Sequence, residues 1–211
     1  MLKMAKLKEK RERLTSEERK AKIIDAALSL FAEKGFSGTK TKEIAEVAKT
    51  SEPLIFWHFK SKEEIYREAL RSLFGAHPVL PDIEKKMAQK DDLEVFKELA
   101  LHVIRHNRED PRIMRLAIFS ALEGFHLAEI VHRDEQIGPA LPEILGGYIK
   151  QRIDDGAFQE QNTEIIAHIF VDLIYTCVLD KETSVSGPPI AYPDEEIVEN
   201  LVRIFVKGLR K

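Results

Sequence analysis

The segment TKEIAEVAKTSEPLIFWHFKSKEEIY, residues 41–66, decides the fold, because it contains two short helical patterns separated by a brief turn. The first pattern starts at Thr41, whose hydroxyl can cap a helix that continues through Ala48. The second pattern starts at Ser51 as the capping residue, and Pro53 suits its first turn, where backbone donors lack helical partners. Helices this short are not stable alone, so we predict that both pack on a third helix.

The third helix is predicted directly upstream. Thr15 and Glu18 have the spacing of a capping box, and Gly35 suits the left-handed residue that ends a helix. Two short helices that pack on a third form the helix-turn-helix arrangement, whose second helix enters the major groove of DNA. The residues expected to face Leu28 and Phe31 are Ile44, Ala45, Ala48, Ile55 and Phe59.

Charge is distributed unevenly along the 211 residues, although the net charge is only -3. Residues 1–62 hold 15 Lys and Arg against 9 Asp and Glu, whereas residues 63–211 hold 18 against 27. A basic N-terminal part favours a polyanionic partner. The basic arm, residues 1–14, fits two interpretations equally well: a solubilising tail, or a segment that follows the minor groove or the phosphates.

Helical periodicity continues to the end of the chain, and no convincing strand pattern is present. Ser61 and Glu64 form a second capping box, which opens a helix that ends near Gly75. Further helices are predicted at residues 82–89, 92–107, 111–132, 139–155, 162–180 and 194–210. The predicted fold is all-α: a three-helix helix-turn-helix domain at 15–60, then a larger helical domain at 61–211 for ligand binding and dimerisation, with helix 61–75 as the connector.

Residues 23–66 resemble the DNA-binding domain of TetR-type (TetR/AcrR) transcriptional regulators. The resemblance rests on ALSLFAEKGF (27–36), TKEIAEVA (41–48) and HFKSKEE (58–64). It implies that Thr41 and Lys62, at the starts of two helices, hold backbone phosphates, and helix N-termini do favour anions. Two departures from the family pattern affect these contacts: Phe56 replaces the usual phosphate-binding Tyr, and Lys49 replaces the usual turn Gly.

Helix positions and the resemblance together give a set of predicted DNA contacts. Trp57 follows the centre of the reading helix, so we interpret it as a contact with the duplex, the alternative being a surface aromatic that packs on its neighbours. The predicted DNA-binding residues are Thr41, Lys42, Lys49, Thr50, Ser51, Glu52, Leu54, Trp57, His58 and Lys62.

The second domain is predicted to hold a small, largely apolar effector, because such sites combine aromatic and aliphatic walls with a few polar groups. The candidate ligand-binding residues are His102, Met114, Phe119, His126, Tyr148, Phe170 and Asp172. The last two helices carry wide apolar stripes, and the resemblance implies a four-helix bundle between two subunits. The predicted interface residues are Ile166, Phe170, Ile174, Leu201, Ile204 and Phe205.

An enzyme is not predicted, because the sequence has no glycine-rich phosphate loop and no G-x-S-x-G motif, and Cys177 lies in an apolar helix. No cofactor is expected. Histidine and glutamate spacings raise the alternative of a metal-responsive regulator, but we interpret these groups as solvated faces and predict no metal site. The groups concerned are His102 and His106, Glu123 with His126, and Glu129 with His132.

The predicted function is a dimeric, ligand-responsive repressor that binds a palindromic operator and leaves it when the effector binds. One cysteine and the lack of a signal-peptide pattern favour the cytoplasm, and no membrane association is expected. Apart from the metal-responsive regulator, one alternative remains open: a helical dimer or adaptor that does not bind an operator.

Overall fold

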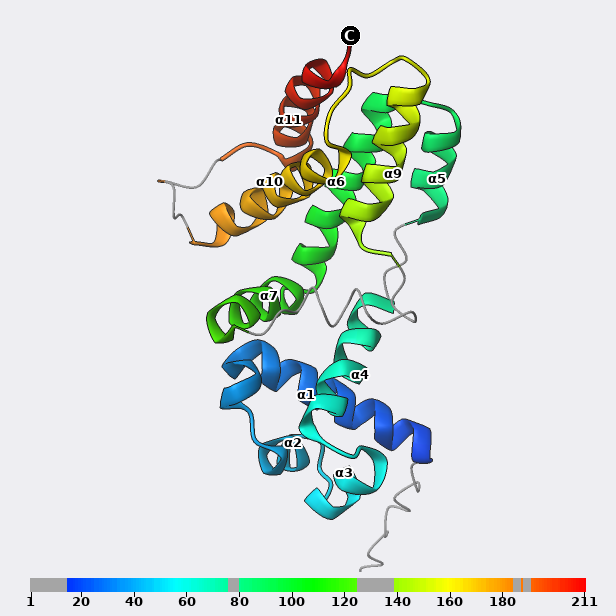
Figure 1. The fold of residues 1–211 in the computed structure, drawn as a ribbon. Coiled ribbons are helices and arrows are strands. Elements are labelled where there is room, and N and C mark those ends of the chain that lie inside the picture. The colour runs from blue at the N-terminus through cyan, green and yellow to red at the C-terminus, as the bar shows by residue number, and fades with distance from the viewer. Residues whose placement is uncertain (1–14, 76–79, 125–138, 184–186, 188–190) are drawn as a thin grey trace, which may run out of the picture.

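The structure is a computed structural model, which describes residues 15–75, 80–124, 139–183, 187 and 191–211. Within these ranges the chain is helical, and β-structure is limited to one isolated bridge between Phe158 and Arg210. The all-α prediction is therefore confirmed. The helices are α1 (Ser16–Gly38), α2 (Thr41–Val47), α3 (Glu52–His58), α4 (Lys62–Gly75), α5 (Leu80–Ala88), α6 (Asp92–Glu109), α7 (Arg112–Glu123), α9 (Leu141–Asp154), α10 (Thr163–Thr183) and α11 (Asp194–Leu209) (Figure 1).

The observed starts of the helices agree in part with the capping residues predicted from the sequence. The capping box is present at α1, where the Thr15 side chain accepts from the Glu18 N–H at 3.2 Å and Glu18 accepts from the Thr15 N–H at 2.7 Å. The prediction for α2 is wrong by one residue, because Lys40 is the cap residue and Thr41 is the first helical residue. Ser51 is the cap residue of α3, as predicted, but its side chain makes no capping hydrogen bond.

Two helix ends also differ from the predictions. Gly35 has the expected positive φ, +74°, but the helix resumes after this break and ends at Gly38. The helix predicted at 111–132 ends at Glu123, because Gly124 adopts the left-handed conformation that closes a helix. The rest of that prediction, residues 125–132, lies outside the described residues.

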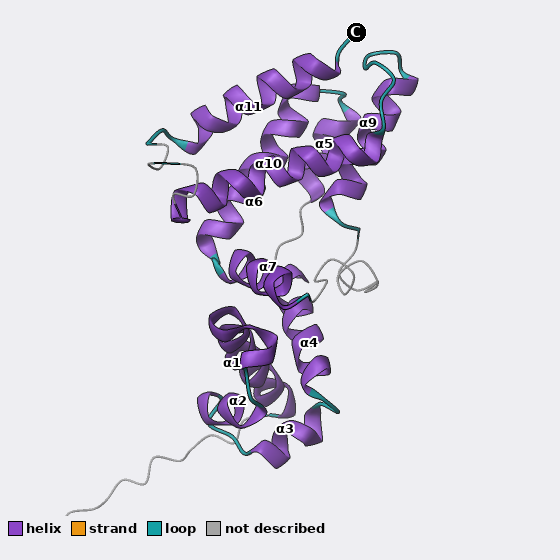
Figure 2. Ribbon diagram, turned by 60° about the vertical axis from the view of Figure 1, so that its left-hand side comes forward, coloured by secondary structure: helices purple, strands orange, loops and turns teal. Residues whose placement is uncertain are grey.

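Buried apolar side chains form two separate groups. The N-terminal cluster consists of the buried side chains of α1–α4 together with Ile113 and Leu116 of α7. The C-terminal cluster consists of the buried side chains of α5, α6, α9, α10 and α11 together with Met114 of α7 and Phe158. The molecule is correspondingly elongated, with α1–α4 at one end and α7 between the two groups (Figure 2).

None of the helices in the described parts of the chain has the length and apolar character needed to span a membrane.

Candidate nucleic-acid interface

The helix-turn-helix packs as its sequence pattern predicted. Ile44, Ala45, Ile55 and Phe59 are buried in the N-terminal cluster, and the partly buried Ala48 packs against it. This burial fixes α2 and α3 on the same core as Leu28 and Phe31 of α1. One face of α3 is thereby held against the protein, and its opposite face remains available to DNA.

The outward face of α3 carries aromatic groups. Trp57 is 71% exposed and Phe56 is 49% exposed, which is far more than large apolar side chains show in a core. The rings of Trp57 and His58 meet edge to face, with centroids 4.7 Å apart. Ser51 is exposed, while Thr50, Leu54 and His58 are half-buried. These side chains give α3 an outer surface that combines aromatic and polar groups.

Thr41 and Glu52, each predicted to contact DNA, contact each other. The Thr41 hydroxyl donates a hydrogen bond to the Glu52 carboxylate, and the two residues are the first of α2 and α3 respectively. This bond ties the starts of the two helices together. A role at the DNA stays a prediction for both residues.

The lysines of the predicted interface differ in their surroundings. Lys42 and Lys49 are exposed, and Lys49 has φ +52°, so a non-glycine residue occupies the left-handed turn position as the sequence suggested. The Lys62 ammonium instead faces the protein, since it donates to the carbonyls of Phe36 at 2.9 Å and Thr39 at 3.1 Å. It also lies 4.2 Å from the centre of the Phe36 ring.

Helix α7 contacts α1 through a set of polar groups that the sequence reading did not identify as an interface. The Glu123 carboxylate accepts from the backbone N–H groups of Phe36 and Ser37, each at 3.1 Å. Arg115 donates to the Ala32 carbonyl at 2.7 Å, and Arg112 pairs with Asp25 at 3.0 Å. The partners are more than 80 positions apart, so the sequence gives little indication of these contacts. Gly35 and Gly124, which favour a break or an end of a helix, are the features that relate to them.

Tyr66 of α4 lies near this contact, and its pKa is affected by the charge of Glu123. Burial, and to a lesser degree the negative charge of Glu123, raise the pKa of Tyr66 to about 12. The Tyr66 ring meets Phe31 edge to face at 4.9 Å and Phe36 at 5.3 Å. The carboxylate of α7 therefore lies close enough to the aromatic side chains of the N-terminal cluster for its charge to affect Tyr66.

The predicted ligand residues do not converge on one place. Met114, Tyr148 and Phe170 are buried in the C-terminal cluster, whereas Asp172 is exposed on α10. Phe119 lies against α1, since a side chain at Gly35 would meet its ring at 2.9 Å. The ring of His102, on α6, lies 4.0 Å from that of His106. His126 lies outside the described residues.

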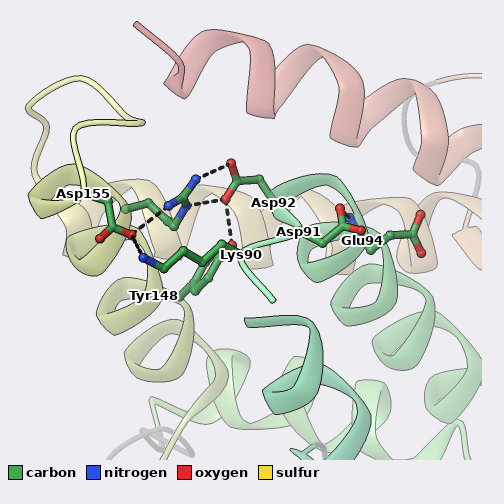
Figure 3. Close-up of polar contacts among 7 residues, drawn as sticks. Lys90, Asp91, Asp92, Glu94, Tyr148 and Asp155 are labelled. Atoms are coloured by element: carbon green, nitrogen blue, oxygen red, sulfur yellow. Dashed lines mark hydrogen bonds and ion pairs between the residues drawn. The ribbon is translucent and has the colours of Figure 1, made fainter. Parts of the chain in front are cut away.

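The Tyr148 hydroxyl is engaged in a buried polar network (Figure 3). It donates to Asp92 at 2.7 Å, and Arg152 donates to the same carboxylate at 2.7 and 3.3 Å. Asp155 accepts from Arg152 at 2.7 Å and pairs with Lys90 at 3.0 Å. Burial and the bond to Asp92 raise the pKa of Tyr148 above its ordinary value. The network joins the start of α6 to the end of α9, which gives Tyr148 a structural role in this conformation.

The predicted dimer residues differ in their surroundings within the monomer, and their role at an interface stays a prediction. Phe170 and Ile174 are fully buried within the monomer, and Ile166, Leu201 and Phe205 pack against the same C-terminal cluster. Of the six, Ile204 is the exposed one, at 73%. Because α10 is apolar on nearly all sides, its sequence did not reveal which face turns inward. The exposed apolar residues of α10 are Ile165, Ile169 and Leu173.

The histidine and glutamate groups singled out as possible metal ligands are only partly described. The described residues contain no group of three or more His, Cys, Asp or Glu side chains suited to a metal ion. Glu123 binds backbone N–H groups of α1, as described above. His126, Glu129 and His132 lie outside the described residues.

These features define a helix-turn-helix DNA-binding protein with a separate helical body. Residues 23–69 match the family model of bacterial regulatory proteins, tetR family. This part of the chain is a TetR-type helix-turn-helix domain, and the relatives that the chain resembles along most of its length are transcriptional regulators rather than enzymes.

One relative and two solved structures are similar to this chain along most of its length. The HTH-type transcriptional regulator YvkB of Bacillus subtilis (strain 168) is 26% identical over 195 residues, which cover 89% of this chain and 95% of that one. The hemolysin II transcriptional regulator HlyIIR superposes with a TM-score of 0.64 at 22% identity, over 93% of this chain and 99% of that one. A TetR family regulator from Marinobacter aquaeolei VT8 gives a TM-score of 0.70 at 16% identity, over 92% and 96% of the two chains. These two solved structures share the fold of this chain.

Proposed function

We propose that the protein is a homodimeric repressor that binds a palindromic operator and releases it when a small, largely apolar effector binds. The observation that carries the proposal is the fixed helix-turn-helix, in which buried Ile55 and Phe59 hold α3 while Trp57 and Phe56 project outward. A helix presented in this way fits the major groove.

The proposed DNA contacts divide into two kinds. Exposed Lys42 and Lys49 would bind phosphates, which position the protein without reading sequence. Ser51, Thr50, Leu54, Trp57 and His58 would contact base edges or the sugars beside them. Thr41 and Glu52 would act as a bonded pair at the start of both helices.

The proposed dimer rests on the outer face of α10 and α11. Ile165, Ile169 and Leu173 recur at every fourth position of α10, and Ile204 projects from α11. An apolar row of this kind is costly to leave in water, and a two-fold contact would bury it twice. Two-fold symmetry also matches the two half-sites of a palindromic operator.

The proposed effector site lies in the C-terminal body, where large apolar side chains of α6, α9 and α10 are concentrated. Met114, Tyr148 and Phe170 are the ligand candidates that are buried in this region. For release, the effector must bind the DNA-free conformation better than the bound one, and by linkage the operator must then weaken effector binding equally.

Selection from a pool of random duplex DNA tests the operator proposal directly. Sequences retained by the purified protein should contain an inverted repeat whose half-sites lie about 34 to 36 Å apart, or a multiple of that spacing. Retention of no common sequence would contradict the proposal and favour an adaptor that does not read DNA.

The Ser51→Ala variant tests the assignment of α3 as the reading helix. Since the Ser51 side chain makes no capping bond, its loss should leave the fold intact. The preference at one base pair should relax by about 1 to 3 kcal/mol. The control is Ser29→Ala, which removes an exposed hydroxyl from α1 and should leave the preference unchanged.

A further inference from the structure

Residues 36–39 form the connecting loop to α2: they are the last helical turn of α1 beyond the break at Gly35, followed by the cap residue Thr39, and they are held from two sides. Glu123, the last residue of α7, accepts the N–H groups of Phe36 and Ser37. Lys62, the first residue of α4, donates to the carbonyls of Phe36 and Thr39. Residues of α4 and α7 thus both hold this segment, and both contact Phe36.

Gly35 shapes the loop for the carboxylate. Its φ of +74° breaks α1, and after this break the next two N–H groups donate outside the helix, to Glu123. A Cβ at Gly35 would lie 2.3 Å from a carboxylate oxygen of Glu123. The Thr39 hydroxyl donates to the Gly35 carbonyl at 2.7 Å, which closes the loop on its inner side. The local geometry therefore fits an acceptor with two oxygens at this point.

The loop leads directly to the reading surface. Its last residue, Thr39, is separated by one residue from Thr41, the first residue of α2. The Thr41 hydroxyl in turn donates to Glu52, the first residue of α3. A displacement of the loop would therefore move the starts of both helices of the helix-turn-helix.

We propose that Glu123 and Lys62 are positioning residues for operator binding, which hold the Phe36–Thr39 loop and, through it, the start of α2 and α3. The proposal rests on the operator binding proposed above. Holding the loop before DNA arrives reduces the ordering that binding requires, and such preorganisation strengthens binding without any contact to the ligand. Glu123 acts from α7, so a residue far from α3 in the sequence contributes to the reading of DNA.

The Glu123→Gln variant tests the proposal. An amide has one acceptor oxygen, and its NH2 group would face a backbone N–H, so one of the two hydrogen bonds is lost. Affinity for the duplex selected by the wild type should fall about tenfold, as expected for loss of one charge-assisted hydrogen bond. The matched control is Glu33→Gln, an exposed residue of α1 that loses the same charge and should bind as the wild type does.

The Lys62→Met variant distinguishes positioning from direct phosphate binding. As a positioning residue, Lys62 should lose affinity about tenfold while the dependence of affinity on salt stays close to that of the wild type. The control is Lys49→Ala, in which loss of an exposed phosphate contact should lower the salt slope by about 1. Thermal unfolding of each variant establishes that folded protein is being compared.

Three results would overturn the inference. Unchanged affinity of both variants, with only a lower melting temperature, would mean that the contacts serve stability alone. A fall of the salt slope by about 1 in Lys62→Met would assign that ammonium to a phosphate. If Glu33→Gln weakened binding as much as Glu123→Gln, the effect would be one of charge. Failure of the wild type to retain any common sequence is a different outcome, because it removes the proposed function and this inference with it.

Discussion

The two halves of the molecule are built under different demands. In the N-terminal cluster, individual positions are fixed by backbone geometry and by named partners: Gly35 for the break, Glu123 for the free N–H groups, Lys62 for the carbonyls. In the C-terminal cluster, most of the stabilisation comes from apolar side chains that many sequences could supply. A surface that must match DNA is expected to tolerate little variation, whereas a helical body held together by apolar packing can accept many sequences.

Helix α7 belongs to both halves. Ile113 and Leu116 are buried in the N-terminal cluster, while Met114, on the other side of the same helix, is buried in the C-terminal cluster. The boundary predicted after residue 60 follows the sequence motif and stays a prediction. The packing of α4 and α7 shows that the helix-turn-helix shares its core with helices that come later in the chain.

The largest predicted effect is in the C-terminal half. Asp92→Asn should reduce the free energy of unfolding by about 3 to 4 kcal/mol, because the part-buried Arg152 guanidinium loses its buried charge partner and keeps only the more exposed Asp155. Denaturant unfolding measures the loss. Asp154→Asn is the control, since its pair with Lys150 is exposed and contributes little to stability. Equal effects of the two variants would show that the network is not a structural anchor.

Leu116→Ala tests whether α7 stabilises the N-terminal half. Leu116 is fully buried, so the variant should lose about 3 kcal/mol. Hydrogen exchange should show lower protection in α1 and α4 than in α9. Leu122→Ala, on the same helix but 78% exposed, should stay within about 0.5 kcal/mol of the wild type. Equal loss of protection in α9 would mean that the two clusters unfold as one unit.

Ile204→Glu tests the proposed dimer without disturbing the monomer. The side chain is exposed in the monomer, so burying its charge in an interface should weaken dimerisation by roughly 2 kcal/mol or more. Sedimentation velocity should show monomers with native circular dichroism. Phe205→Glu should unfold the protein instead, because its ring packs on Phe96 and Phe170. A wild-type monomer at micromolar concentration would contradict the dimer.

The smallest predicted effect is at the turn of the helix-turn-helix. Lys49→Gly should raise the free energy of unfolding by roughly 0.5 kcal/mol: relief of the left-handed conformation is partly offset by the freedom of glycine in the unfolded chain. Lys42→Gly, within α2, should lower it by about 1 kcal/mol. Thermal unfolding compares the two. A less stable Lys49→Gly protein would show that the lysine side chain itself supports the turn.

The parts predicted correctly from the sequence depend on short-range signals. The capping box of Thr15 and Glu18, and the burial of Ile44, Ile55 and Phe59, follow from spacing within one or two helices. Long-range contacts gave no comparable signal. The spacing of Glu123 and His126 suggested a metal ligand, but the partners of Glu123 lie on α1. The sequence of neither helix indicates that the two helices are in contact.

The inward face of α10 was the other element beyond prediction. Apolar residues surround this helix, so the pattern fits several rotations equally well. Contacts with α6 and α9 place Phe170 and Ile174 inside and leave Ile169 outside. Rotation of an apolar helix is decided by its neighbours, and their arrangement was not available from periodicity.

The position of α7 also affects when the N-terminal half can fold during synthesis. When Gly75 has left the ribosome, α1–α4 are complete, but Leu116 and Glu123, which pack on them or bind to them, have not yet been synthesised. At typical rates of about 5 to 20 residues per second, the roughly 50 residues that follow take several seconds to translate. During that interval the apolar side of α1 lacks its cover, so the nascent helix-turn-helix is expected to depend on chaperones until α7 emerges.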